Sequence, residues 1–180
     1  MEKRKQTVVK LAQTALLAAL IAIGAFISIP IGPIPFTLQN FFVFMAGLLL
    51  LPEYATLSVL SYVLLGLVGL PIFSGFKGGI NYIFSPTFGF LIAFIIGAFV
   101  ISKLAHGKTK FTEILIALII GEVIFYAIGL PYMYVILTKV VGTTMTASKV
   151  FTVGMIPFLI PDLGKAVIAA LIAPKIRRAL

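Results

Sequence analysis

The side chains with the clearest potential for chemistry are Asp162 and Lys165, an acid and a base inside the apolar run 155–173. They are three residues apart, so on a helix they share a face and can meet. A charge at membrane depth costs roughly 2.5–3.5 kcal/mol even on a lenient scale, so it calls for an explanation. A carboxylate accepts from ligand N–H groups, and an ammonium donates to a carbonyl or carboxylate. We interpret the pair as a ligand anchor, with a purely structural ion pair as the alternative.

A proline, Pro161, stands directly before this acid. Proline lacks a backbone N–H and is favoured in the first turn of a helix. We therefore expect Asp162 in the first turn of a helix that the proline restarts, where the positive end of the helix dipole favours its charge.

Further polar candidates lie in the Gly-rich segment 74–85 and at the start of the apolar run 36–51. In the first segment, Asn81 and Tyr82 follow two glycines that allow a ligand close to the backbone. An Asn amide donates and accepts, which suits an amide-like or urea-like group, although an ordinary turn would explain it as well. In the second, Thr37, Gln39 and Asn40 are polar and face the same side; Gln39 could reach the pocket, cap the helix or bond to the Pro-rich loop.

Glu122 is a third candidate for a buried charge, near the middle of the apolar run 111–137. It could be a proton carrier. It could also be a neutral acid that is hydrogen-bonded inside the bundle, and we favour this second interpretation. We expect no other carboxylate at a similar depth that could form a proton relay with it.

The apolar run 8–29 contains the spacing Ala-x-x-x-Ala twice, at residues 15/19 and 18/22. Small residues four apart form a smooth strip on which another helix can approach closely. Taken alone, this pattern favours packing within the chain.

Composition places the chain in the membrane. Of its 180 residues, 61% are hydrophobic and 11% are charged, whereas a soluble domain has about 25% charged residues. The absence of cysteine excludes disulfides and thiolate metal sites, and a single histidine, His106, leaves no histidine metal cluster. No G-x-x-x-x-G-K-[ST] motif and no nucleophile–base pair is present, so we expect neither ATP hydrolysis nor enzymatic activity. The net charge of +9 resides at the ends of apolar runs, which indicates membrane topology and not nucleic-acid binding.

The apolar runs predict one membrane domain over residues 1–180, an all-α integral membrane protein with six transmembrane helices. The expected helices are about 8–29, 36–51, 55–73, 86–102, 111–137 and 155–173. The second run is only about 24 Å long as a helix, short of the ~30 Å hydrocarbon core. Three prolines in 29–35 exclude regular helix between the first two runs.

Basic residues set the expected orientation, with the N- and C-termini cytoplasmic. Ten basic residues then lie inside, namely Lys3, Arg4, Lys5, Lys10, Lys103, Lys108, Lys110, Lys175, Arg177 and Arg178, against three outside, Lys77, Lys139 and Lys149. Such a bias is typical of the positive-inside rule. The Gly/Pro-rich loops 29–35, 74–85 and 138–154 then fall outside. We infer an outward-facing pocket that these loops cover and that reaches Asp162 and Lys165.

Several of these motifs, taken together, resemble one family: the biotin-specific substrate-binding components (S components, BioY type) of energy-coupling-factor (ECF) transporters. The similar segments run in the family's order over nearly the whole chain: Pro33-Ile-Pro-Phe-Thr-Leu-Gln39, Ala46-Gly-Leu-Leu-Leu50, Leu65-Gly-Leu-Val-Gly-Leu-Pro-Ile-Phe73, Ser85-Pro-Thr-Phe-Gly-Phe90 and Pro157-Phe-Leu-Ile-Pro-Asp-Leu-Gly-Lys165. The resemblance implies a six-helix protein of the prokaryotic cell membrane that binds biotin from outside. It also implies assembly with a membrane coupling subunit and two cytoplasmic ATPases, which alone use ATP, so that the chain itself needs no cofactor.

The resemblance also implies roles for individual residues. Asp162 and Lys165 match the family's polar pair in the last helix, and Asn81 matches an asparagine at its ligand site. Ala15 and Ala19 match the first-helix motif that meets the coupling subunit. Candidate aromatic covers for the ligand ring are Phe36, Phe73 and Tyr82. An arginine that some members carry in the fourth helix is missing, so Lys77 or Lys165 is left to meet the carboxylate of biotin.

Two other functions remain open at this point. One is a proton-coupled secondary transporter of a small molecule that uses Glu122, and the other is an S component for another vitamin. A structural membrane subunit would bind no ligand at all.

Overall fold

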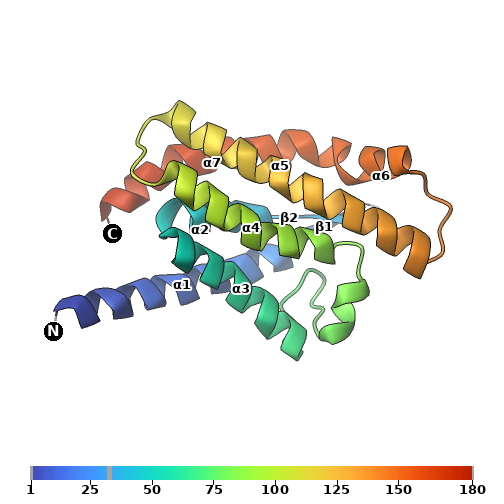
Figure 1. Cartoon of the computed structure of the whole chain (residues 1–180), viewed down its shortest axis with the longest axis horizontal. Coiled ribbons are helices and arrows are strands. Elements are labelled where there is room, and N and C mark those ends of the chain that lie inside the picture. The colour runs from blue at the N-terminus through green and yellow to red at the C-terminus, as the bar shows by residue number, and fades with distance from the viewer. Residues whose placement is uncertain (1, 32–33, 180) are drawn as a thin grey trace.

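The computed structural model describes residues 2–31 and 34–179, and it consists mainly of helices (Figure 1). The α-helices are α1 (Glu2–Phe26), α2 (Gln39–Leu49), α3 (Pro52–Val68), α4 (Phe88–Ala105), α5 (Phe111–Val135), α6 (Ala147–Gly154) and α7 (Ile156–Ala179). Two strands, β1 (Ser28–Ile31) and β2 (Ile34–Thr37), a 3₁₀ helix, η1 (Ile80–Phe84), and a π-helical turn, η2 (Ile136–Val140), complete the chain. Both termini lie at the same end of the molecule (Figure 1).

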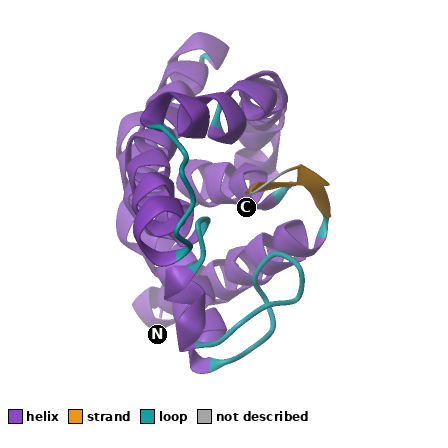
Figure 2. Cartoon of the chain, turned by 90° about the vertical axis from the view of Figure 1, so that its right-hand side faces the viewer, coloured by secondary structure: helices purple, strands orange, loops and turns teal. Residues whose placement is uncertain are grey.

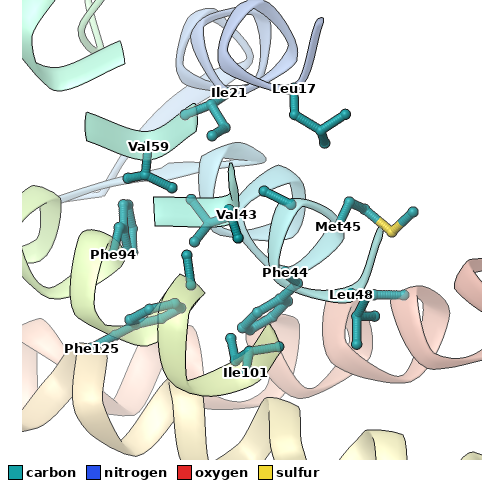
Figure 3. Close-up of a cluster of buried hydrophobic side chains, with 14 of the residues drawn as sticks. Leu17, Ile21, Val43, Phe44, Met45, Leu48, Val59, Phe94, Ile101 and Phe125 are labelled. Carbon is teal, nitrogen blue, oxygen red and sulfur yellow. The ribbon is translucent and has the colours of Figure 1, made fainter. Parts of the chain in front are cut away.

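The six larger helices form two layers of three. One layer holds α1, α2 and α7, the other holds α3, α4 and α5, and each helix packs against its counterpart across the layers (Figure 1). The centre is α2, which contacts α1, α3, α4 and α7. Its side chains Val43 and Phe44 are fully buried in the core, between Ile21 of α1 and Phe125 of α5 (Figure 3).

Among the described residues, four helices are long and apolar enough to cross a membrane, within Arg4–Phe26, Phe88–Ala105, Phe111–Val140 and Ile156–Ala179. The two other large helices, α2 and α3, are shorter, with 11 and 17 residues. At 1.5 Å per residue α2 covers only about 16 Å, even less than expected for the run 36–51. The strand β2 takes the first two residues of this run, Phe36 and Thr37.

The Pro-rich segment that we predicted to be non-helical is a β-hairpin, shown in orange in Figure 2. Its strands pair antiparallel, with Ser28 opposite Thr37 and Pro30 opposite Pro35. The short hairpin leads the chain from α1 directly to the buried start of α2.

Two segments expected as loops contain helices. Residues 74–85 include η1, and residues 138–154 include α6. The start of α6 has a side-chain cap, because the hydroxyl of Thr146 accepts from the backbone N–H of Lys149 at 3.2 Å. Thr is among the residues that are favoured at the start of a helix.

The expectation that Pro161 restarts a helix is wrong. The helix α7 begins at Ile156 and continues through Pro161, so Asp162 lies beyond the first turn. The missing N–H of Pro161 removes one helical hydrogen bond without ending the helix, as neighbouring elements allow in membrane helices. The dipole of a helix start therefore does not explain the charge of Asp162.

Near the termini, Arg177 ties three helices together. Its guanidinium donates to the backbone oxygens of Leu48, Ala105 and Lys108, which lie at or after the ends of α2 and α4. The last carbonyls of a helix have no partner within the helix, and a cation there also complements the helix dipole. Arg177 on α7 thus provides hydrogen-bond donors for backbone carbonyls at the C-terminal ends of α2 and α4.

Replacement of Arg177 by Met should lower the free energy of unfolding by about 1–2 kcal/mol, since helix-end carbonyls lose a charged donor. Lys at this position should restore only part of the loss, because it lacks the planar fork. The measurement is thermal or denaturant unfolding of the purified protein in detergent. Arg178→Met, at the exposed neighbour, is the matched control, and an equal loss in both variants would contradict the assignment.

Candidate functional site

A buried polar network joins α2 to α7. Asp162 and Lys165 are only 6% and 7% exposed. The Nζ of Lys165 donates to Oδ1 of Asp162 at 2.8 Å, to Oδ1 of Asn40 at 2.8 Å and to the backbone oxygen of Thr37 at 2.7 Å. An ammonium has three N–H donors, so these bonds use all of them. Lys165 also lies over the ring of Phe36, with Nζ 4.1 Å from the ring centroid.

The carboxylate of Asp162 has two further donors. Asn40 Nδ2 donates to Oδ1 at 2.9 Å, and the hydroxyl of Tyr126 on α5 donates to Oδ2 at 2.7 Å. Asn40 therefore bridges the acid and the base with both ends of its amide. The predicted pairing of Asp162 with Lys165 is confirmed, and in this structure the protein itself satisfies both charges.

Asn40 and Tyr126 were not among the predicted site residues. Asn40 follows Gln39 in the sequence, and Tyr126 lies one helical turn after Glu122. Their proximity to polar candidates was a weak signal. It did not indicate which of several helices would meet α7.

A cavity adjoins this network. Its walls come from α2, α4, α5 and α7, and from β2, Ser74 and Gly154. The lining residues are Ile34, Pro35, Thr37, Gln39, Asn40, Ser74, Thr87, Phe90, Leu91, Phe94, Glu122, Phe125, Tyr126, Gly154, Phe158, Asp162 and Lys165. The cavity volume is about 80 Å³. The cavity is therefore narrow, with four phenylalanine rings facing a few polar groups.

Close helix packing brings two of these rings into the wall. Phe90 of α4 lies against Gly129 of α5, and Phe125 of α5 lies against Gly97 of α4. In both cases a Cβ atom on the glycine would overlap the ring. The two glycines let each ring lie on the backbone of the opposite helix, which holds both rings at the cavity.

Glu122 lies on the cavity wall beside Asp162. The expectation that no other carboxylate shares its depth is therefore wrong. The two acids are 40 residues apart in the chain, and the packing of α5 against α7 brings them together. One oxygen of Glu122, Oε2, is buried without a hydrogen-bond partner among the described residues.

The residues at the start of α2 also line the cavity. Gln39 is 5% exposed, and its Nε2 has no partner in the part of the chain that the structure describes. Thr37 contributes its backbone oxygen to Lys165, and its hydroxyl accepts from the backbone N–H of Gln39 at 3.3 Å. Gln39 thus reaches the cavity and does not cap the helix with its side chain.

The other predicted ligand residues lie farther out. Asn81 and Tyr82 line a separate surface depression together with Lys77. Tyr82 packs on the fully buried Phe73, and its hydroxyl lies 3.0 Å from that of Thr87, which does line the cavity. The structure therefore brings Asp162, Lys165, Gln39 and Thr37 together at one cavity, and it does not bring Asn81, Tyr82 or Phe73 to its wall.

The two alanine pairs of α1 have different environments. Ala18 and Ala22 are buried, whereas Ala15 and Ala19 lie on an adjacent strip of the helix that is exposed. Packing within the chain therefore accounts for the pair 18/22. It leaves the pair 15/19 open to the surroundings.

A second, more apolar cavity lies between α5, α6 and α7. It shares Glu122, Tyr126 and Asp162 with the first cavity, and its other walls include the exposed Val123 and Leu163. These three shared residues form a partition between the two cavities.

Comparison with known proteins shows to which family the chain is similar. The model of the BioY family matches residues 1–180. "Biotin transporter BioY" of Thermotoga maritima is 44% identical over 169 residues, which cover 94% of this chain and 96% of the relative. "Probable biotin transporter BioY" of Pyrococcus horikoshii is 43% identical over 163 residues, 91% of this chain and 93% of the relative.

A solved structure agrees with these relatives. The S component for biotin from an ECF-type ABC transporter superposes with a TM-score of 0.85 at 30% identity, over 97% of this chain and 93% of the other. The resemblance inferred from the motifs is therefore confirmed.

The buried pair can be tested by unfolding the purified protein in detergent. Lys165→Met should lower the free energy of unfolding by about 3–5 kcal/mol, because Asp162 stays buried without its positive partner. The double variant Asp162→Leu, Lys165→Met should lose much less than the sum of the single losses.

The surface pair Lys108–Glu113, with Nζ 3.1 Å from Oε1, is the matched control. Its coupling should stay below about 1 kcal/mol, since both side chains are exposed to solvent. A coupling at Asp162–Lys165 no larger than that of the surface pair would contradict the network.

Proposed function

The chain belongs to the BioY family, and we propose that it is the substrate-binding membrane subunit that captures biotin outside the cell for ATP-driven uptake. The observation that carries this proposal is a narrow aromatic cavity beside a buried Asp–Lys pair, in a chain 44% identical to a biotin transporter. In this role the subunit binds and releases its ligand without chemical change.

The chemistry of biotin suits such a cavity. Biotin has a cyclic urea with two N–H donors and a carbonyl, an apolar thiophane ring and a carboxylated tail. The rings of Phe90, Phe94, Phe125 and Phe158 offer an apolar surface for the thiophane, and the polar groups of α2, α5 and α7 can meet the urea. Ligand pockets commonly combine apolar walls with a few polar groups in this way.

Asp162 remains able to meet the ligand although the protein satisfies its charge. A carboxylate has about four acceptor positions, and three donors reach it here, from Asn40, Lys165 and Tyr126. We propose that one urea N–H takes the remaining position. Lys165 then holds the carboxylate in place and contacts the ligand only if it gives up one of its own partners.

We further propose six membrane spans with both termini cytoplasmic, in a prokaryotic cell membrane. The excess of basic residues near the termini and in the 103–110 turn supports this orientation. The short helices α2 and α3 would cross with help from the hairpin and from segment 74–85, which non-helical backbone allows when it is buried in protein. We place the mouth of the cavity at β2 and Ser74, so that it faces outward.

The proposed partners are a membrane coupling subunit and two cytoplasmic ATPases. The structural relative comes from an ECF-type ABC transporter, and the exposed pair Ala15 and Ala19 offers a smooth surface for another helix. ATP would be used by the partners alone. We propose no cofactor and no nucleic-acid partner for this chain.

A second candidate function is proton-coupled transport through Glu122, which the adjacent carboxyl of Asp162 favours. Vesicles with the purified chain alone, under a pH gradient, separate the two functions. Proton-driven uptake by the chain alone, abolished in Glu122→Gln, would favour the second. Uptake that requires the partners and ATP favours the first.

Biotin should bind the purified chain in detergent, while riboflavin and thiamin should not, as measured by titration calorimetry. Asp162→Asn should weaken biotin binding roughly tenfold to a hundredfold, because a charged acceptor of the urea is lost. Glu113→Gln, at the surface carboxylate, is the control. No heat with biotin would refute the proposed ligand, and an unaltered affinity in Asp162→Asn would refute the role of this residue.

Replacement of Ala15 and Ala19 together by Trp should reduce co-purification with the coupling subunit at least about tenfold, since bulky side chains prevent close helix approach. Biotin affinity should stay unchanged, because both residues lie outside the cavity. Leu171→Trp, at an exposed residue of α7, controls for bulk at the lipid-facing surface. Normal assembly of the double alanine variant would exclude this strip as the interface.

A further inference from the structure

Buried polar atoms without partners mark one part of the cavity. Among the residues that the structure describes, three buried side-chain atoms have no hydrogen-bond partner: Gln39 Nε2, Ser58 Oγ and Glu122 Oε2. Native proteins keep such atoms rare, because each forfeits the hydrogen bonds it made to water. Two of the three belong to residues that line the same cavity, from α2 and from α5, whereas Ser58 lies on α3 away from it.

The two cavity atoms are of opposite kinds. The amide nitrogen of Gln39 can only donate, and the carboxyl oxygen of Glu122 can accept. The rest of the polar wall is largely used within the protein, because Lys165 has spent its three donors and Asn40 bonds through both ends of its amide. Besides the remaining acceptor position of Asp162, the residues that line the cavity therefore hold one unpartnered donor and one unpartnered acceptor.

We propose, on the basis of the proposed function, that Gln39 and Glu122 are the residues that recognise the head group of the ligand. Gln39 donates to its carbonyl oxygen, and Glu122 accepts from a neighbouring N–H. The matching chemical class is a cyclic urea or amide, in which a C=O and an N–H stand side by side. In this arrangement Asn40 and Lys165 are positioning residues, which hold Asp162 beside Glu122.

If Gln39 and Glu122 recognise the ligand, their replacement changes the affinity for biotin and the stability of the free protein in different ways. In the free protein, an apolar side chain of the same shape removes an unpartnered polar atom, so Gln39→Met should leave the melting temperature unchanged or raise it, whereas Glu122→Met also removes the contact of Glu122 with Asp162. With ligand present the same variants should bind biotin roughly tenfold to a hundredfold more weakly, because a urea group is left unpaired. A purely structural role predicts the reverse pattern, a lower melting temperature with unchanged affinity.

Ligand analogues identify which atom each residue meets. A biotin methylated at the urea nitrogen lacks the N–H, so Glu122→Met should weaken its binding less than about threefold beyond the wild-type value. An analogue with C=NH in place of C=O presents a donor where biotin has an acceptor. Gln39→Glu, which replaces a donor by an acceptor, should raise the affinity for this imino analogue relative to biotin at least about tenfold.

The experiment is calorimetric titration of wild-type and variant protein in detergent with biotin and the two analogues, together with melting curves of the ligand-free proteins. Ser58→Ala is the matched control, since it removes the unpartnered atom that lies away from the cavity. Its affinities should equal those of the wild type.

The outcomes are distinct. If wild-type protein does not bind biotin, the proposed function fails. If it binds biotin, but Glu122→Met weakens biotin and the N-methyl analogue equally, or Gln39→Glu leaves the order of biotin and imino analogue unchanged, the assignment of these two residues fails while the proposed function stands.

Discussion

A buried ammonium group needs a hydrogen-bond acceptor for each of its three N–H donors. The positions of the elements around the site follow from this requirement of Lys165. Its three bonds reach the end of β2, the first turn of α2 and its own helix. The start of α2 must therefore lie beside the middle of α7, and the hairpin must deliver it there. Tyr126 of α5 joins through Asp162, so one charge relates three helices and a strand.

The aromatic wall of the cavity is held in place by close apolar packing, and not by polar groups. The α4–α5 pair is held by rings set onto glycine backbone, Phe125 on Gly97 and Phe90 on Gly129. Interiors packed at crystal-like density resist changes in shape. A rigid aromatic wall therefore faces a polar wall that hydrogen bonds hold in place.

Features with short-range causes could be predicted from the sequence. Composition indicated the membrane, prolines excluded helix from 29–35, and the spacing of Asp162 and Lys165 predicted that they meet. Contacts between distant segments could not be predicted, because they depend on which helices become neighbours. Asn40 meets Asp162 across 122 positions, and Glu122 meets it through the packing of α5 on α7. Pro161 was misjudged for a similar reason, since a helix supported by its neighbours tolerates the lost hydrogen bond that would end an isolated one.

The partition made by Glu122, Tyr126 and Asp162 borders both cavities, and the walls of the second, apolar cavity include exposed side chains. An acyl chain resting in that cavity would press on the same three side chains that border the ligand. Lipid bound in the second cavity would then influence the binding of the ligand in the first.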